Sequence, residues 1–338
     1  MDTPDHGFDP ALEVARALLA SPIDALEQVG GGRNSRVFRV RSARGEYALK
    51  QYPSPREDPR DRLGTEVDTL AVMEQQGFEC VPKVVAADRN RGFAVLSWID
   101  GTPVGTVRDR DIDQACEFLA RVHALRKLPT LAHGRLASEA CLSGAEIERQ
   151  VAGRLSELAI LTAEEPDLRA FLDCSFAPSW ERLVAHSKQS MQAAGLDFTA
   201  LLPEERRSLV PSDFGFHNAI RRPDGSLAFI DFEYFGWDDP AKLTSDVLFH
   251  PGTPLADNQR HRFRAQAQGV FGDDPHFKSR LEAYLPLFGL RWVLIVLNEF
   301  LPRRWRLRQM AGATDSWGEA KRRQLGLAQD LLAQAEAA

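Results

Sequence analysis

Residues 209–220 read "LVPSDFGFHNAI" and place Asp213 and Asn218 five residues apart in a loop rich in Phe and Gly. Residues 227–240, "LAFIDFEYFGWDDP", then supply Asp231 directly after a short apolar run. Mg²⁺ prefers oxygen ligands and is commonly held by one or two carboxylates together with phosphate oxygens. Asn218 and Asp231 suit that ligand role, and Asp213 suits accepting the proton of an attacking hydroxyl. A single loop Asp usually forms a turn or cap, but this set predicts a site for a hard cation and a phosphate.

The composition is that of a soluble globular protein with one large domain or two lobes. Of its 338 residues, 43% are hydrophobic and 27% are charged, and the net charge is −6. The negative balance predicts no nucleic-acid partner. The N-terminal stretch 1–22 carries acids where an export signal would carry Lys or Arg, which favours a cytoplasmic location.

Two further features also favour a soluble, cytoplasmic protein. The apolar stretch 284–301 is interrupted by Pro, Arg, Asn and Glu, so it predicts a buried helix and no membrane partner. The four cysteines form no CxxC pair, which predicts reduced, buried thiols and neither a zinc site nor a disulfide framework.

Hydrophobic periodicity divides the chain into three parts. Residues 1–20 predict a helical extension, and residues 21–100 predict a sheet of five strands with one helix that ends at Gly77. Residues 101–338 predict mostly helices, interrupted by the short strands "SLV", "NAIRR" and "LAFID", the last two joined by the turn "PDG". A mostly β lobe therefore precedes a mostly α lobe.

The segment "VGGGRNSRVF" places Gly30, Gly31 and Gly32 between two predicted strands. Glycines let the backbone approach a phosphate closely. The segment lacks the Gly-Lys-Ser/Thr of a Walker A loop, and a strand follows where a dinucleotide-binding fingerprint needs a helix. Either a flap that covers phosphates or a glycine hairpin without a ligand fits this pattern.

Lys50 and Glu66 form a second candidate pair. Lys50 ends the apolar alternation of "YALK", and Glu66 borders the apolar stripe of the predicted helix. A buried charge is costly unless it is paired. The alternative is two separate solvated charges. If they pair, Lys50 is held where an ammonium can contact nucleotide phosphates.

The order of these motifs resembles the aminoglycoside phosphotransferase and choline kinase family, a branch of the protein-kinase-like fold. The resemblance rests on "GGGRNSRVF", "YALK", "EVDTL", "VLSWIDG", "EFLARVHAL", "SDFGFHNAI" and "FIDFEYFGWDDP", and covers about residues 20 to 250. It implies an α+β, bilobal fold with a small antiparallel-sheet N-lobe and a larger, mostly helical C-lobe. It also implies an ATP- and Mg²⁺-dependent kinase that phosphorylates a hydroxyl of a small metabolite, such as a sugar, an amino alcohol or an aminoglycoside-like compound.

The resemblance also implies residue roles. Asp213 matches the catalytic Asp, while Asn218 and Asp231 match the metal ligands. The residues that match nucleotide-binding positions are Gly30, Gly31, Gly32, Asn34, Ser35, Lys50, Glu66, Ser97, Trp98 and Ile99.

The chain departs from the family pattern at several positions. Pro211 and Ser212 stand where the family has His-Gly, and Phe216 stands where it has Pro. An Asp is usual at Leu243, and Asp246 lies three residues further on. None of these changes removes a reacting group, so we expect an active enzyme. The alternative is a kinase-like regulator that binds nucleotide without transferring phosphate.

The acceptor is expected to be a small molecule with a hydroxyl group, bound by a monomer or homodimer. Trp292 and Glu299 share one face of a predicted helix and can hold a sugar face or an amine. Core packing is the alternative role for that pair. Asp238 and His217 are further candidate acceptor residues, and their alternative roles are a helix cap for Asp238 and filling of the loop for His217. Glu233 completes the set of candidate acceptor residues. The absence of a strongly acidic patch favours a hydroxylated metabolite such as a sugar over a polycationic antibiotic.

Overall fold

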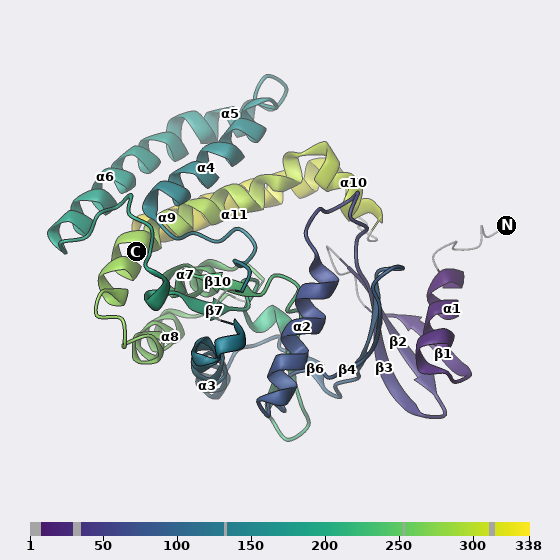
Figure 1. The fold of residues 1–338 in the computed structure, drawn as a ribbon. Helices are drawn as coiled ribbons and strands as arrows, with labels where there is room; N and C mark the ends of the chain where they lie inside the picture. The colour runs from purple at the N-terminus through teal and green to yellow at the C-terminus, as the bar shows by residue number, and fades with distance from the viewer. Residues whose placement is uncertain (1–7, 30–34, 132–133, 253, 311–314) are drawn as a thin grey trace. The chain divides into compact units, whose positions relative to one another are not determined.

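The computed structural model describes residues 8–29, 35–131, 134–252, 254–310 and 315–338 (Figure 1). These residues form two compact units, and neither is one continuous stretch of chain. The first unit comprises Met1–Val104 and Phe216–Phe235, and the second comprises Gly105–Gly215 and Gly236–Ala338. The chain therefore re-enters the first unit between Asp213 and Asn218.

The first unit is built on an antiparallel five-stranded sheet, as the sequence predicted. Its strands follow the order β1-β2-β3-β5-β4. Their bounds are β1 (Ile23–Gln28), β2 (Arg36–Ser42), β3 (Gly45–Gln51), β4 (Val84–Asp88) and β5 (Phe93–Ser97). Side chains alternate between the two faces of each strand. Leu49 and Lys50, which are neighbours on β3, therefore belong to opposite faces.

Helix α1 (Phe8–Leu19) packs against the Leu49 face of this sheet. Its buried residues Ala11, Val14, Ala15 and Leu19 form one hydrophobic cluster with residues of β2, β3 and β5. Complete burial of a Val or Leu side chain contributes about 1.5–3 kcal/mol. The helix is thus part of the hydrophobic core of the first unit.

Helix α2 (Arg62–Gln75) carries Glu66 and packs against β4 and β5. Its N-cap is Asp61, whose carboxylate accepts a hydrogen bond from the Gly64 amide at 2.9 Å. The predicted stop at Gly77 is confirmed, because this glycine has a φ of +71°. These two ends fix the turn of the helix from which Glu66 projects.

A small antiparallel sheet of β6 (Thr102–Pro103), β8 (Ala219–Arg221) and β9 (Leu227–Phe229) completes the first unit. The predicted hairpin forms, with Ala219 opposite Phe229. The register continues one residue further, because the Ile230 amide donates to the Asn218 carbonyl at 3.0 Å. The hairpin thus brings Asn218 next to the residue that precedes Asp231.

The second unit is mostly helical. Its α-helices are α3 (Asp109–Ala124), α4 (Gly144–Ala159), α5 (Pro166–Phe171), α6 (Ala177–Ala193), α7 (Pro240–Phe249), α8 (Asp257–Val270), α9 (Phe277–Val296), α10 (Pro302–Met310) and α11 (Trp317–Glu336). Strands β7 (Ser208–Val210) and β10 (Gly236–Asp238) pair antiparallel. Shorter helical turns are η1 (Leu125–Lys127), η2 (Pro129–Leu131), η3 (Leu172–Phe176), η4 (Glu204–Arg206), η5 (Phe216–Asn218) in the first unit, and η6 (Leu297–Phe300).

Helix α9 is the central helix of this unit and packs against α4, α6, α7 and α11 (Figure 1). The segment Phe277–Phe300 is apolar and long enough to cross a membrane, but 83% of its most apolar window is buried inside the protein. The prediction of a buried helix is confirmed. The strand β10 was not predicted, because "GWD" has no alternating pattern.

The cysteine prediction was partly wrong. Cys116 and Cys141 are buried, but Cys80 is only partly buried and Cys174 is exposed. Cys174 lies in η3, a π-helical turn between α5 and α6. The wider turn changes which side chains face the core, and the sequence does not reveal this change.

Candidate functional site

A cluster of carboxylates lies around the buried Lys50 in the first unit. The ammonium nitrogen is 2.6 Å from the Glu66 carboxylate, 2.7 Å from Asp231 and 3.2 Å from Glu233. Lys50 comes from β3, Glu66 from α2, and the other two from the segment after β9. The predicted Lys50–Glu66 pair therefore forms, and Asp231 and Glu233 join it.

The carboxylates determine the charge of this lysine. Burial acts to lower the pKa of Lys50, but the charges of Asp231 and Glu66 outweigh it and hold that pKa well above its ordinary value. The Tyr52 hydroxyl donates to Glu66 at 2.7 Å, and burial raises the pKa of Tyr52. Lys50 is therefore an ammonium, and Tyr52 is a neutral hydrogen-bond donor.

The same cluster has the donor set of a cation site. Carboxylate oxygens of Glu66, Asp231 and Glu233 lie within 4.8 Å of one another. Oxygen donors at such spacing suit a hard divalent cation. Asp231 also has a φ of 71°, a left-handed conformation that costs a residue with a side chain about 1–3 kcal/mol. Strain of this kind is concentrated at functional sites.

Glu233 was predicted to contact the acceptor, and the structure corrects this. It is 2% exposed, and its carboxylate accepts from Ser35 at 2.9 Å and pairs with Arg62 at 3.1 Å. A carboxylate bound by Lys50, Arg62 and Ser35 holds the interior of the first unit together. The hydroxyl of Ser35 thus ties the end of the glycine segment to this cluster. Gly30, Gly31, Gly32 and Asn34 lie outside the described residues.

The remaining predicted nucleotide residues lie at the end of β5. The Ser97 amide donates to the Lys83 carbonyl at 2.8 Å, and the Ser97 hydroxyl accepts from the Lys83 amide at 2.9 Å. The Arg39 guanidinium lies 4.6 Å from the centre of the Trp98 ring. Ile99 is half-buried. Their role at an adenine edge stays a prediction.

The other predicted residues of the catalytic loop are divided between the units. Asn218 and His217 are half-buried in η5 of the first unit, whereas Asp213 follows β7 in the second. Ser212 has a φ of 67°, and its hydroxyl donates to the Ser138 carbonyl at 3.1 Å. Glycine adopts this conformation without strain. This accounts for the glycine that the family places here, and the hydrogen bond offsets part of the strain in serine.

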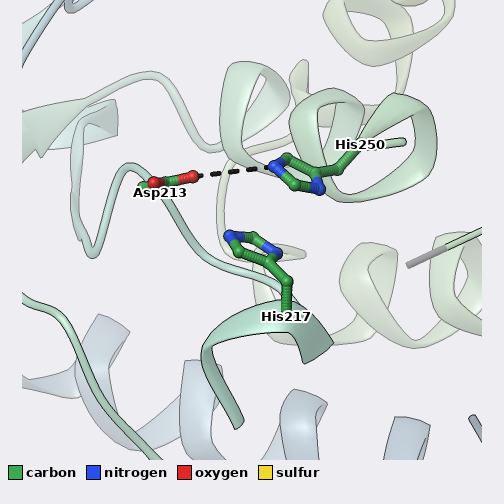
Figure 2. Close-up of side chains that lie close together, drawn as sticks. All are labelled: Asp213, His217 and His250. Atoms are coloured by element: carbon green, nitrogen blue, oxygen red, sulfur yellow. Dashed lines mark ion pairs between the residues drawn. The ribbon is translucent and has the colours of Figure 1, made fainter. Parts of the chain in front are cut away.

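One side chain near Asp213 was missed by the sequence analysis. The Nε2 atom of His250 lies 3.9 Å from an Asp213 carboxylate oxygen (Figure 2). His250 is the residue that ends α7. No local motif marks it, because the contact joins residues that are far apart in the sequence.

Asp238 cannot contact an acceptor, which corrects a second prediction. It is wholly buried, accepts from the Cys141 and Asp239 amides at 2.8 Å each, and lies 3.2 Å from Lys242. Burial raises the pKa of Asp238. The alternative, a helix cap, applies to its neighbour Asp239, which accepts from the Ala241 amide at the start of α7.

Trp292 and Glu299 do not share one helical face. Helix α9 ends at Val296, and Glu299 lies in the 3₁₀ turn η6, where it pairs with Arg308 at 2.8 Å. The indole N–H of Trp292 donates to Asp246 at 2.8 Å, and its ring meets the His250 ring edge to face at 4.8 Å. Trp292 is thus bound to two neighbours and is not an open platform for a sugar.

Asp246 has the structural role that its spacing suggested. It lies 3.2 Å from Lys242 and 3.4 Å from Arg291, and it accepts from Trp292. His123 is also satisfied, because its ring nitrogens contact Ser208 at 2.8 Å and Asp273 at 3.2 Å.

Comparisons with known proteins concern the family and the fold of the chain. A model of the phosphotransferase enzyme family matches residues 25–276. The search of curated proteins found no match. Among solved structures, the choline kinase LicA from Streptococcus pneumoniae is 16% identical with a TM-score of 0.57, over 97% of this chain and 99% of that one.

Two other structures are similar to a comparable degree. The gentamicin complex of APH(2")-IIa is 16% identical with a TM-score of 0.55, over 99% of each chain. The macrolide 2'-phosphotransferase MphH from Brachybacterium faecium is 16% identical with a TM-score of 0.56, over 91% of this chain and 99% of that one. These likenesses confirm the predicted protein-kinase-like fold. The family match over residues 25–276 shows that this chain belongs to the phosphotransferase enzyme family and is a phosphotransferase.

Proposed function

We propose that the protein is an ATP- and Mg²⁺-dependent kinase that transfers the γ-phosphate to a hydroxyl of a small metabolite. The observation that supports this most is the buried Lys50, bonded at once to Glu66 and Asp231. A permanent ammonium beside a carboxylate cluster is the arrangement that nucleotide phosphates and a divalent cation require. Among the similar structures are an ATP ternary complex of APH(2")-IIa and an AMP complex of LicA.

Each residue then has a distinct task. Lys50 contacts nucleotide phosphates and offsets negative charge that develops during transfer. Asp231 and Asn218 would hold Mg²⁺, which would neutralise phosphate charge when bound. The hairpin supports this pairing, because the Ile230 amide donates to the Asn218 carbonyl at 3.0 Å and so brings Asn218 next to the residue that precedes Asp231. Asp213 accepts the hydrogen bond, and then the proton, of the acceptor hydroxyl.

The charges of the second unit favour a neutral acceptor. Glu139, next to the Ser138 that binds Ser212, pairs with Arg154 and Arg291. The two arginines hold the pKa of Glu139 at about 2 against the effect of burial. A polycationic antibiotic gains little from carboxylates that are already paired. A sugar or other hydroxylated metabolite fits better.

The test is an ATP-consumption screen against sugars, amino alcohols and aminoglycosides. The Asp213→Asn variant should lower turnover about 10²- to 10⁴-fold with little change in ATP affinity, because it removes the proton acceptor. Asp330→Asn makes the same charge change on the exposed side of α11 and serves as the control. Unchanged turnover in the Asp213 variant contradicts the proposal. Mg²⁺-dependent ATP binding without transfer to any compound supports a regulator instead.

A further inference from the structure

The His250 side chain faces the proposed catalytic carboxylate from the end of α7 (Figure 2). Its Nε2 atom lies 3.9 Å from the Asp213 oxygen. This separation is too long for a direct hydrogen bond. One oxygen atom at an ordinary hydrogen-bond distance of about 2.8 Å from each of the two atoms spans it.

The hydrogen bonds of the His250 ring define which nitrogen carries the proton. The Gly252 amide donates to Nδ1 at 3.0 Å. A nitrogen that accepts a hydrogen bond carries no proton, so the neutral ring carries its hydrogen on Nε2. The group that faces Asp213 is therefore an N–H donor.

The ring is also held in place from its other side. Trp292 meets it edge to face, at 4.8 Å between ring centres and 78° between planes. The Trp292 indole is itself fixed by its hydrogen bond to Asp246 at 2.8 Å. His250 is therefore a donor whose position is set before any ligand binds.

We propose that His250 binds the reacting hydroxyl of the acceptor, whose oxygen accepts from His250 Nε2 while its hydrogen points to Asp213. This inference rests on the proposed function. The histidine holds one lone pair of the oxygen, the carboxylate holds its hydrogen, and the second lone pair is left to attack. Trp292 is a positioning residue that acts through His250.

The transfer step balances with these groups. The acceptor oxygen forms a bond to the γ-phosphorus, and the bond from that phosphorus to the bridging oxygen of the leaving ADP breaks with its electron pair. The hydroxyl proton passes to Asp213, and His250 keeps its own proton. A protonated amine has no lone pair for the Nε2–H donor, so the pair selects an alcohol over an ammonium group.

The first experiment needs no acceptor. Protein labelled with ¹⁵N-histidine is studied by long-range ¹H–¹⁵N correlation NMR, and the signals of His250 are assigned by their loss in His250→Gln. In spectra recorded at a pH where the ring is neutral, the Nδ1 signal should be that of an unprotonated nitrogen and the Nε2 signal that of a protonated one. The opposite tautomer overturns the proposal.

The second experiment separates binding of the acceptor from binding of the nucleotide. His250→Gln keeps an N–H donor near the Nε2 position, whereas His250→Phe keeps a ring without one. With the best alcohol from the screen, the Phe variant should lose about 10- to 100-fold in kcat/KM for the acceptor. Its rate of ATP hydrolysis, in which water is the acceptor, should fall to a similar extent. The Gln variant should recover most of that loss, and the affinity for ATP should stay the same in both.

The outcomes distinguish the two proposals. If Asp213→Asn loses turnover but His250→Phe keeps the wild-type kcat/KM, the role of His250 is wrong and the proposed function stands. An equal loss in the Phe and Gln variants assigns the effect to packing against Trp292 and also overturns the role of His250. A wild-type protein that transfers phosphate to no compound and not to water refutes the proposed function, and this inference with it.

Discussion

Replacing Lys50 by methionine should destabilise the first unit strongly. The substitution leaves Glu66, Asp231 and Glu233 without the ammonium that now lies 2.6 to 3.2 Å from each of them. Removing one partner of a buried ion pair costs about 3–5 kcal/mol, because Glu66 then stays buried without its ammonium partner, although Glu233 keeps Arg62. Total stabilities are about 5–15 kcal/mol, so the loss is a large fraction.

The pH dependence follows from the direction of the pKa shift. The pKa of Lys50 is raised in the folded protein, so its stabilising contribution is complete below the unfolded value of about 10.5 and is lost only as the pH rises above that value. Between pH 5 and 8 the wild-type lysine therefore does not titrate. The charge of Lys50 should therefore contribute equally to stability at pH 5 and at pH 8.

Hydrogen exchange of peptides from β3 and α2, measured at increasing urea concentration, reports the stability of the first unit alone. The double variant Lys50→Met with Glu66→Met removes both charges of the closest pair. Its free energy of unfolding should be at least about 2 kcal/mol higher than the value obtained by adding the separate losses of Lys50→Met and Glu66→Met. A loss below about 1 kcal/mol in Lys50→Met, or simple additivity in the double variant, refutes this account of the cluster.

Two further predictions concern the second unit. Gly236→Ala should cost at least about 2 kcal/mol of unfolding free energy, because a Cβ there would lie 2.5 Å from the Ala137 amide nitrogen. Gly153→Ala is the control, because this glycine lies at an exposed helical site with open space around it, and it should stabilise the protein by about 0.5–1 kcal/mol. Urea denaturation measures the free energy of unfolding of both variants. Equal effects in the two variants would contradict the packing argument. Burial, aided by Arg126, lowers the pKa of His123 to about 4, so the folded state resists its protonation and stability falls as the pH drops below about 6.5. By pH 4.5 the loss of unfolding free energy from this group is about 2–3 kcal/mol. In acid denaturation, the stability of His123→Asn should therefore fall less steeply with pH than that of the wild type. An identical pH profile would exclude this contribution.

Local patterns in the sequence were sufficient for much of the fold. Alternation placed Lys50 in a strand, helical spacing placed Glu66 at a buried face, and the "PDG" turn gave the hairpin that carries Asn218 and Asp231. Each of these rests on interactions between residues that are close in sequence. The Lys50–Glu66 pair was accessible for the same reason, since burial of either charge demands a partner.

Long-range contacts were not accessible in this way. Glu233 lies two residues after Asp231 in the same motif, yet its partners Ser35 and Arg62 lie 198 and 171 residues away. The change from α-helix to 3₁₀ turn after Val296 moved Glu299 off the expected face. His250 belongs to no motif, and its proposed role follows only from its position just after the end of α7.

The discontinuous first unit has a consequence for synthesis of the protein on the ribosome. A chain that has emerged only to Val104 lacks the β8–β9 hairpin to which β6 pairs, and also lacks Asp231 and Glu233 beside Lys50. In this nascent segment, two of the three carboxylate partners of Lys50 have not yet been synthesised. It must wait for more than a hundred further residues, so slow translation of that stretch prolongs the time during which the N-terminal sheet is vulnerable to proteases and to misfolding.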